Sequence, residues 1–96
     1  MFIGACKIKL HAPWSGSLKD KRMAIRSITD KCRHKFNITM AEVADNELHR
    51  MITLGFAVVS NSRGHAEESL DHILSFIEEY SDCEIISEER DYFVIE

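Results

Sequence analysis

The chain of 96 residues has only one proline, Pro13, and only four glycines. This scarcity excludes collagen-like sequences and proline- and glycine-rich disordered sequences, because both need these residues in large amounts. No apolar run approaches the roughly 20 residues that a membrane-spanning helix requires. We therefore expect one folded domain over residues 1–96, with no membrane partner.

Cysteines and catalytic motifs are equally scarce. Cys6, Cys32 and Cys83 are odd in number and far apart, so the sequence predicts neither a disulfide framework nor a zinc knuckle. His65 and His72 would lie about 10.5 Å apart along a helix, too far for one metal. The chain also lacks a Ser/His/Asp triad and a glycine-rich phosphate loop. No basic segment precedes an apolar run near residue 1, so we expect no secretory leader. We expect a reduced, cytoplasmic, non-enzymatic protein with no catalytic residue, metal or cofactor.

Charge is unevenly distributed along the chain. Twelve Lys and Arg residues against sixteen Asp and Glu residues give a net charge of −4. Residues 1–50 carry ten basic and five acidic residues (+5), whereas residues 51–96 carry two and eleven (−9). Such asymmetry either produces a basic face on an acidic protein or reflects two oppositely charged elements that pack together.

Hydrophobic periodicity predicts six elements. They are a strand over Phe2–Ala12, a helix from Ser17 to Phe36, a strand over Asn37–Asp45, a strand over Arg50–Ser60, a helix capped by Asn61 or Ser62, and a strand over Glu84–Ile95. The order strand, helix, strand, strand, helix, strand indicates an α+β ferredoxin-like sandwich. In this fold a four-stranded antiparallel sheet carries both helices on one face, with the first and third strands at its centre.

The other face of the sheet should be open to solvent. Lys7, Lys9 and His11 alternate with apolar residues along the first strand, so we expect their side chains on this open face as possible contacts. The charged run from Glu88 to Asp91 interrupts the last strand pattern. It predicts a bulge or a twisted edge at those residues.

A basic ridge runs along the predicted first helix. Lys19, Arg22, Arg26 and Arg33, at offsets of 3, 4 and 7, would lie beside the apolar stripe of that helix. One interpretation is that the ridge contacts RNA phosphates. The other is that it faces the acidic second helix and is neutralised there.

The turn before this helix is a candidate anion site. Ser15 and Ser17 stand at the helix start, where free amides and the dipole attract anions, and Lys19, Lys21 and Arg22 follow at once. The alternative is an ordinary helix start, with Ser17 as N-cap.

Four segments resemble the YlxP-like family of small bacterial proteins of unknown function. They are G-A-C-K-I-K-L from Gly4, S-L-K-D-K-R from Ser17, F-N-I-T-M-A-E-V-A-D from Phe36 and L-G-F-A-V-V-S-N from Leu54. The resemblance implies a ferredoxin-like fold and an accessory role in translation or ribosome maturation. It implies no catalytic residue.

Three functional hypotheses follow. The first is a protein that contacts structured RNA, in particular ribosomal RNA or the ribosome, through the residues Ser15, Ser17, Lys19, Lys21, Arg22, Arg26 and Arg33. The second is a protein-interaction module that forms a homodimer through the open sheet face or an edge strand and has no nucleic-acid role. The third is a small acylphosphatase-like enzyme, which the lack of an arginine in the turn after the first strand disfavours.

Overall fold

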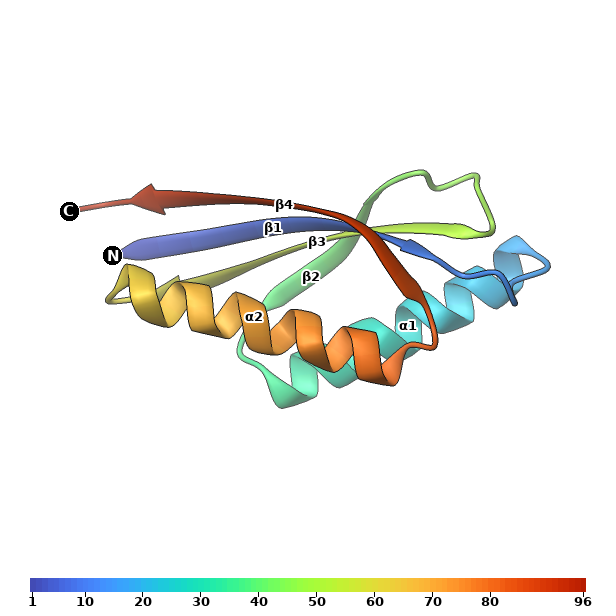
Figure 1. Cartoon of the computed structure of the whole chain (residues 1–96), viewed down its shortest axis with the longest axis horizontal. Helices are drawn as coiled ribbons and strands as arrows, with labels where there is room; N and C mark the ends of the chain where they lie inside the picture. Colours follow the sequence, from blue (N-terminus) through green and yellow to red (C-terminus); the bar gives the residue numbers. More distant parts are fainter.

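The computed structural model describes residues 1–96 and has the six elements in the predicted order. They are β1 (Phe2–His11), α1 (Leu18–Lys35), β2 (Thr39–Ala44), β3 (Met51–Ser60), α2 (Arg63–Tyr80) and β4 (Glu84–Val94). The strands form one antiparallel sheet in the order β2-β3-β1-β4. Both helices cover the same face of this sheet, and the other face is uncovered (Figure 1). The structure therefore confirms the ferredoxin-like arrangement, with β1 and β3 at the centre.

The core lies between the sheet and the two helices. Alternate residues of the central strands point into it, and Ile8, Leu10, Ile52 and Leu54 are fully buried there. The apolar stripes of the helices close it from the other side with Ile28, Cys32, Leu70, Ile73 and Ile77. Burial of each large aliphatic side chain contributes about 1.5–3 kcal/mol, which makes this layer the main stabilising feature. Neither helix is both long and apolar enough to cross a membrane.

Helix α1 begins at a capped turn, as predicted. The Ser17 hydroxyl accepts a hydrogen bond from the Asp20 amide at 3.1 Å, and the Asp20 carboxylate accepts one from the Gly16 amide at 2.9 Å. These bonds satisfy two donors near the helix start. The last turn is closed by the Phe36 amide, which donates to the Cys32 carbonyl at 2.8 Å.

Helix α2 begins after Ser62, whose hydroxyl accepts from the His65 amide at 3.1 Å. Of the two predicted caps, Ser62 rather than Asn61 is therefore the one used. A 2.6 Å hydrogen bond joins the hydroxyls of Ser27 on α1 and Tyr80 on α2.

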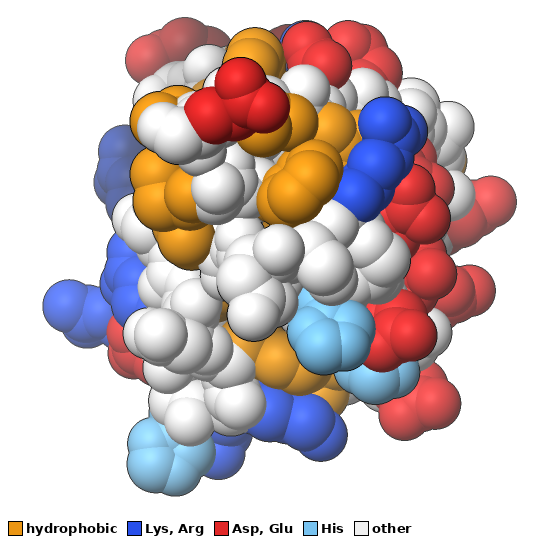
Figure 2. Space-filling model, turned by 90° about the vertical axis from the view of Figure 1, so that its left-hand side faces the viewer, with side chains coloured by type: hydrophobic (Ala, Val, Ile, Leu, Met, Phe, Trp, Pro, Cys, Tyr) orange, Lys and Arg blue, Asp and Glu red, His pale blue; other side chains and the backbone are white.

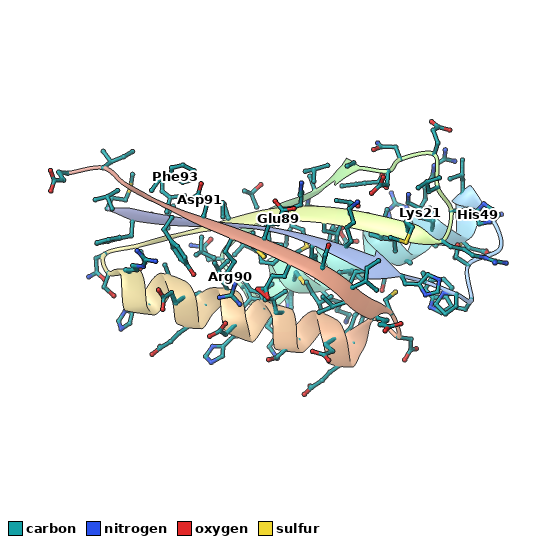
Figure 3. All side chains as sticks on the ribbon, turned by 45° about the horizontal axis from the view of Figure 1, so that its top comes forward. Lys21, His49, Glu89, Arg90, Asp91 and Phe93 are labelled. Atoms are coloured by element: carbon teal, nitrogen blue, oxygen red, sulfur yellow. The ribbon has the colours of Figure 1, made fainter.

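Strand β4 differs from the prediction in where its irregularity lies. The residues from Glu88 to Asp91 pair regularly with β1, and the register shifts instead at Ile86, between Ile85 and Ser87. Because this pairing is regular, side chains of the charged run alternate between the two faces of the sheet (Figure 3). On the helix face, the Arg90 guanidinium lies 2.7 Å from the Asp71 carboxylate of α2.

Candidate functional site

The basic ridge on α1 consists of three exposed cations, Lys19, Arg22 and Arg26. With Met23 they line a shallow hollow of about 410 Å³. None of the three forms an ion pair within 4.0 Å. Their charges are therefore available to an external anion.

The ridge faces away from α2. The side of α1 that faces α2 is marked by Ser27, which bonds to Tyr80, and by Lys35, whose ammonium nitrogen lies 4.8 Å from the centroid of the Phe76 ring. No ion pair joins α1 to α2. Of the two interpretations of the ridge, neutralisation by the acidic second helix is therefore wrong.

Arg33 continues the line of the ridge but makes a structural contact. Its guanidinium donates to the main-chain carbonyl of Met40 at 2.6 Å. Met40 belongs to β2, which is an edge strand, so Arg33 covers part of an otherwise open edge. The side chain is still exposed, but one of its donors is engaged, so Arg33 is not one of the free cations of the ridge.

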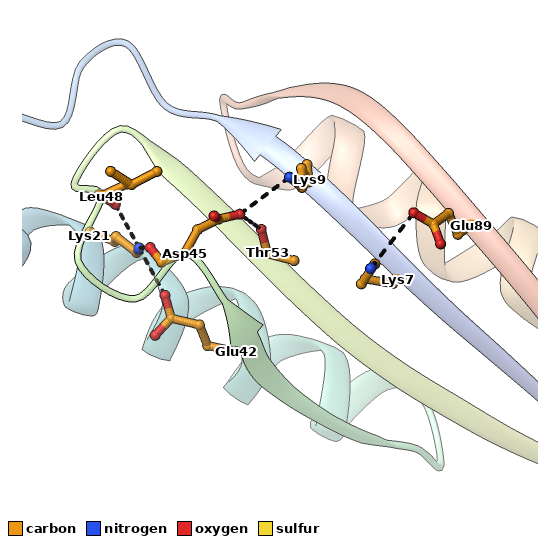
Figure 4. Close-up of polar contacts among 8 residues, drawn as sticks. All are labelled: Lys7, Lys9, Lys21, Glu42, Asp45, Leu48, Thr53 and Glu89. Carbon is orange, nitrogen blue, oxygen red and sulfur yellow. Dashed lines mark hydrogen bonds and ion pairs between the residues drawn. The ribbon is translucent and has the colours of Figure 1, made fainter.

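Lys21 is buried and does not belong to the exposed surface. Only 1% of the residue is accessible, and its ammonium group donates to the carbonyl oxygens of Asp45 and Leu48 at 2.6 and 2.7 Å. Its third neighbour is the Glu42 carboxylate at 2.9 Å (Figure 4). Two of its three donors are engaged by carbonyl oxygens and a carboxylate already neutralises its charge, so this buried ammonium group is not available to a phosphate. Sequence reasoning missed this role because Lys21 lies on the core-facing side of an otherwise typical basic segment.

The serine turn before α1 is also engaged internally. Ser15 is fully buried, and its hydroxyl donates to the Ser17 carbonyl at 3.2 Å. The Ser17 hydroxyl accepts a hydrogen bond from the Asp20 amide. The Asp20 carboxylate in turn accepts one from the Gly16 amide, and so occupies the position where an anion would have to bind. Because a carboxylate repels a phosphate, the structure favours the ordinary capped start over an anion site at Ser15 and Ser17.

The open sheet face carries charges of both signs, and it holds Lys7, Lys9 and His11 as predicted. Lys7 lies 3.7 Å from Glu89 of β4, and Lys9 lies 3.6 Å from Asp45 (Figure 4). The lysines are thus partly neutralised by carboxylates that sequence reasoning did not assign to this face. Strand alternation in β4 was the signal that could have placed Glu89 there.

Asp45 is held in its charged form. The Thr53 hydroxyl donates to its carboxylate at 2.6 Å, and this hydrogen bond is the main cause that lowers the pKa of Asp45, with a further contribution from Lys9. Its backbone φ of 57° lies in the left-handed region, which Asp tolerates better than most residues. Asp45 therefore anchors the end of β2 to both β3 and β1.

The three thiols are buried, and burial raises the pKa of Cys6 and of Cys32 to about 11. A thiol in this environment is protonated at neutral pH and is a weak nucleophile. No three His, Cys, Asp or Glu side chains come together as a metal-binding group. The charged surfaces are therefore the features that invite a functional interpretation.

Comparison with known proteins agrees with the resemblance drawn from the motifs. Residues 3–90 match the family described as "Protein of unknown function (DUF503)". The "Uncharacterized protein YlxP" of Bacillus subtilis (strain 168) is 33% identical over 70 residues, which cover 73% of this chain and 76% of that protein. Neither description names a ligand or a reaction.

Proposed function

Because the chain belongs to the DUF503 family of proteins of unknown function, we propose a function from its own surface. The protein is a non-enzymatic cytoplasmic accessory factor of translation or ribosome maturation. It binds the phosphate backbone of structured RNA through the basic ridge formed by Lys19, Arg22 and Arg26. The observation that carries this proposal is that these three exposed cations have no carboxylate partner.

The spacing of the ridge suits a row of phosphates. At 1.5 Å per residue, Lys19 and Arg22 are about 4.5 Å apart along the helix axis, and Arg22 and Arg26 about 6 Å. Long cationic side chains at these intervals can each reach a different phosphate of one strand. Contacts of this kind position a nucleic acid without reading its sequence.

Structured RNA is favoured over a flexible single strand. Single-stranded nucleic acids are usually held by aromatic side chains on which the bases stack. The hollow along the ridge has no aromatic lining residue, and Phe56 of the central strand is buried in the core. The exposed Trp14 donates its indole N–H to the Asp82 carbonyl, beside the end of α2, and so lies away from the ridge. The role in translation or ribosome maturation that the YlxP-like resemblance implies supports ribosomal RNA as the structured RNA.

The acidic surface of α2 then orients the complex. The carboxylates of α2 repel RNA from that side of the protein. The cations on the outer flank of α1 attract it. The overall charge of −4 is compatible with this binding mode, since the field at the ridge depends on nearby charges more than on the total.

The test is fluorescence anisotropy with a labelled ribosomal RNA hairpin. Three phosphate contacts predict a slope of about −2.7 in a plot of log K against log salt, or roughly 40-fold weaker binding between 50 and 200 mM salt. Replacement of both Arg22 and Arg26 by Glu should abolish binding. Binding that withstands both the salt and the double substitution would contradict the proposal.

The same helix offers a matched control. Lys31 lies nine residues after Arg22 and therefore on the opposite side of the helix, and Lys35 contacts Phe76. The double variant Lys31→Glu with Lys35→Glu changes the net charge by the same amount. It should retain most of the affinity, whereas an equal loss would show that only total charge matters.

A further inference from the structure

The uncovered face of the sheet combines a bulky apolar row with a hollow. In the strand register, Ile3 lies opposite both Val59 and Phe93, so these three residues form a row across β3, β1 and β4. Val59 is 68% exposed and Phe93 is 51% exposed, although both are large and apolar. The row continues to the exposed chain ends, where apolar side chains gather (Figure 2). An exposed apolar cluster of this kind marks an interaction surface.

The hollow lies next to this row on the same face. Its volume is about 540 Å³, and its floor is made of small residues, including Ala5, Ala41, Gly55 and Ala57. The Val43 side chain lies close against Gly55, where an added Cβ atom would be only 2.9 Å from Val43 Cγ1. One face therefore presents both bulky apolar side chains and a depression that can receive such side chains.

Electrostatics points to the occupant of this face. Lys7 and Lys9 are offset by Asp45, Glu89 and Asp91, so the face as a whole is close to neutral. The outer flank of α1 is positive and the surface of α2 is negative, so two copies of the chain would repel one another through either of those surfaces. The open face is the large surface that two copies can share without net repulsion.

Pairing through the sheet edges is disfavoured. Arg33 covers the edge of β2 at Met40, and two copies joined there would bring their basic ridges together. The β4 edge carries Glu88, Glu89 and Asp91 against the single cation Arg90, so two copies joined there would bring together two edges of net negative charge. Charged and covered edges of this kind prevent strand addition. Of the two dimer geometries that the sequence suggested, face-to-face contact is the one the structure favours.

The available area is sufficient for a specific contact. Four strands about 4.8 Å apart and ten residues of about 3.3 Å give a face of roughly 600 Å² per copy. Two copies would then bury about 1,200 Å², the lower end of the range for specific protein interfaces. We propose that the open sheet face binds a second copy of this chain, with the row of Ile3, Val59 and Phe93, at the end of the sheet near the chain termini, as the main apolar contact.

This dimer leaves the basic ridges outside. The helices lie on the face opposite the contact, so the α1 flank of each copy remains accessible (Figure 1). The inference is therefore independent of the proposed RNA binding. Either property can fail in an experiment while the other persists.

The test is light scattering coupled to size exclusion. The unmodified chain should have about twice its mass of 11.0 kDa. Val59→Lys and Val59→Glu should each shift the protein to the monomer, weakening association at least tenfold, because a charge of either sign would be buried in the contact. Met23→Lys is the matched control: Met23 is 63% exposed but lies on α1, so the variant should remain a dimer.

Circular dichroism must show that the Val59 variants are folded. If a Val59 variant unfolds, Phe93→Glu tests the same row at a second position, near the end of β4. A folded, monomeric Phe93→Glu would then support the proposal on its own. The proposal is overturned if the unmodified chain is a monomer at about 100 µM, well above the micromolar dissociation constants of weak specific contacts. It is equally overturned if folded variants at both positions remain dimers.

Discussion

The ammonium nitrogen of Lys21 lies 2.9 Å from the Glu42 carboxylate and also donates to the carbonyl oxygens of Asp45 and Leu48. It thereby ties α1 to the end of β2 and to the loop that follows. The Glu42 oxygen that faces Lys21 is buried and has no hydrogen-bond partner, so the ion pair with Lys21 is what offsets its charge. Each group therefore depends on the other, since a buried charge without a partner is costly.

We predict that Lys21→Met destabilises the protein by about 3 kcal/mol, because it leaves the Glu42 carboxylate without its counter-ion and two main-chain carbonyls without their donor. Guanidinium chloride unfolding, followed by circular dichroism, measures this change. Lys19→Met is the control, since Lys19 is exposed and unpaired, and its effect should stay within about 0.5 kcal/mol. Adding Glu42→Leu to Lys21→Met should recover part of the loss. Equal stabilities for the Lys21 and Lys19 variants would refute the structural role of Lys21.

Asp45 predicts a pH dependence of stability. Its pKa is lowered in the folded protein, chiefly by the hydrogen bond from Thr53. A carboxyl group with a lowered pKa stabilises the fold fully above its unfolded pKa, and this stabilisation is lost as the pH falls through the folded pKa. The protein should therefore lose stability below about pH 4, near the ordinary pKa of Asp.

The variant Asp45→Asn isolates this contribution. Asn accepts the Thr53 hydrogen bond and tolerates the positive φ, so the fold should persist. The free energy of unfolding, measured at a series of pH values, should fall less steeply in acid for the variant than for the unmodified chain. Parallel curves would show that Asp45 does not carry the pH dependence.

Sequence periodicity was sufficient to predict the fold. In both strands and helices, the sequence pattern records which side chains point into the core. The protein has a single core, so this pattern can be read directly, as for the buried Ile8 and Leu10 of β1. Helix starts were predictable for the same local reason: the Ser17 and Ser62 hydroxyls act on amides only three residues away. The register shift at Ile86 was not predictable, because it depends on how β4 pairs with β1 and not on the local charge of β4.

The candidate site was only partly predictable. The helical period placed Lys19, Arg22 and Arg26 together, but it could not show that none of the three forms an ion pair. Burial of Lys21 depends on the loop after β2, which is distant in sequence. Long-range contacts of this kind separate a structural lysine from one that is available to a ligand.

The salt dependence of RNA binding gives a finer test of the ridge. Lys19→Gln removes one phosphate contact, so the slope of log K against log salt should become shallower by about 1, with weaker binding to every RNA sequence. Lys31→Gln serves as the control, because Lys31 is exposed on another side of α1. Anisotropy titrations of both variants with the same RNA hairpin at several salt concentrations measure the slopes. If the Lys31 variant changes the slope as much as the Lys19 variant does, the contact is not confined to the outer flank of α1, and the ridge is not the binding surface.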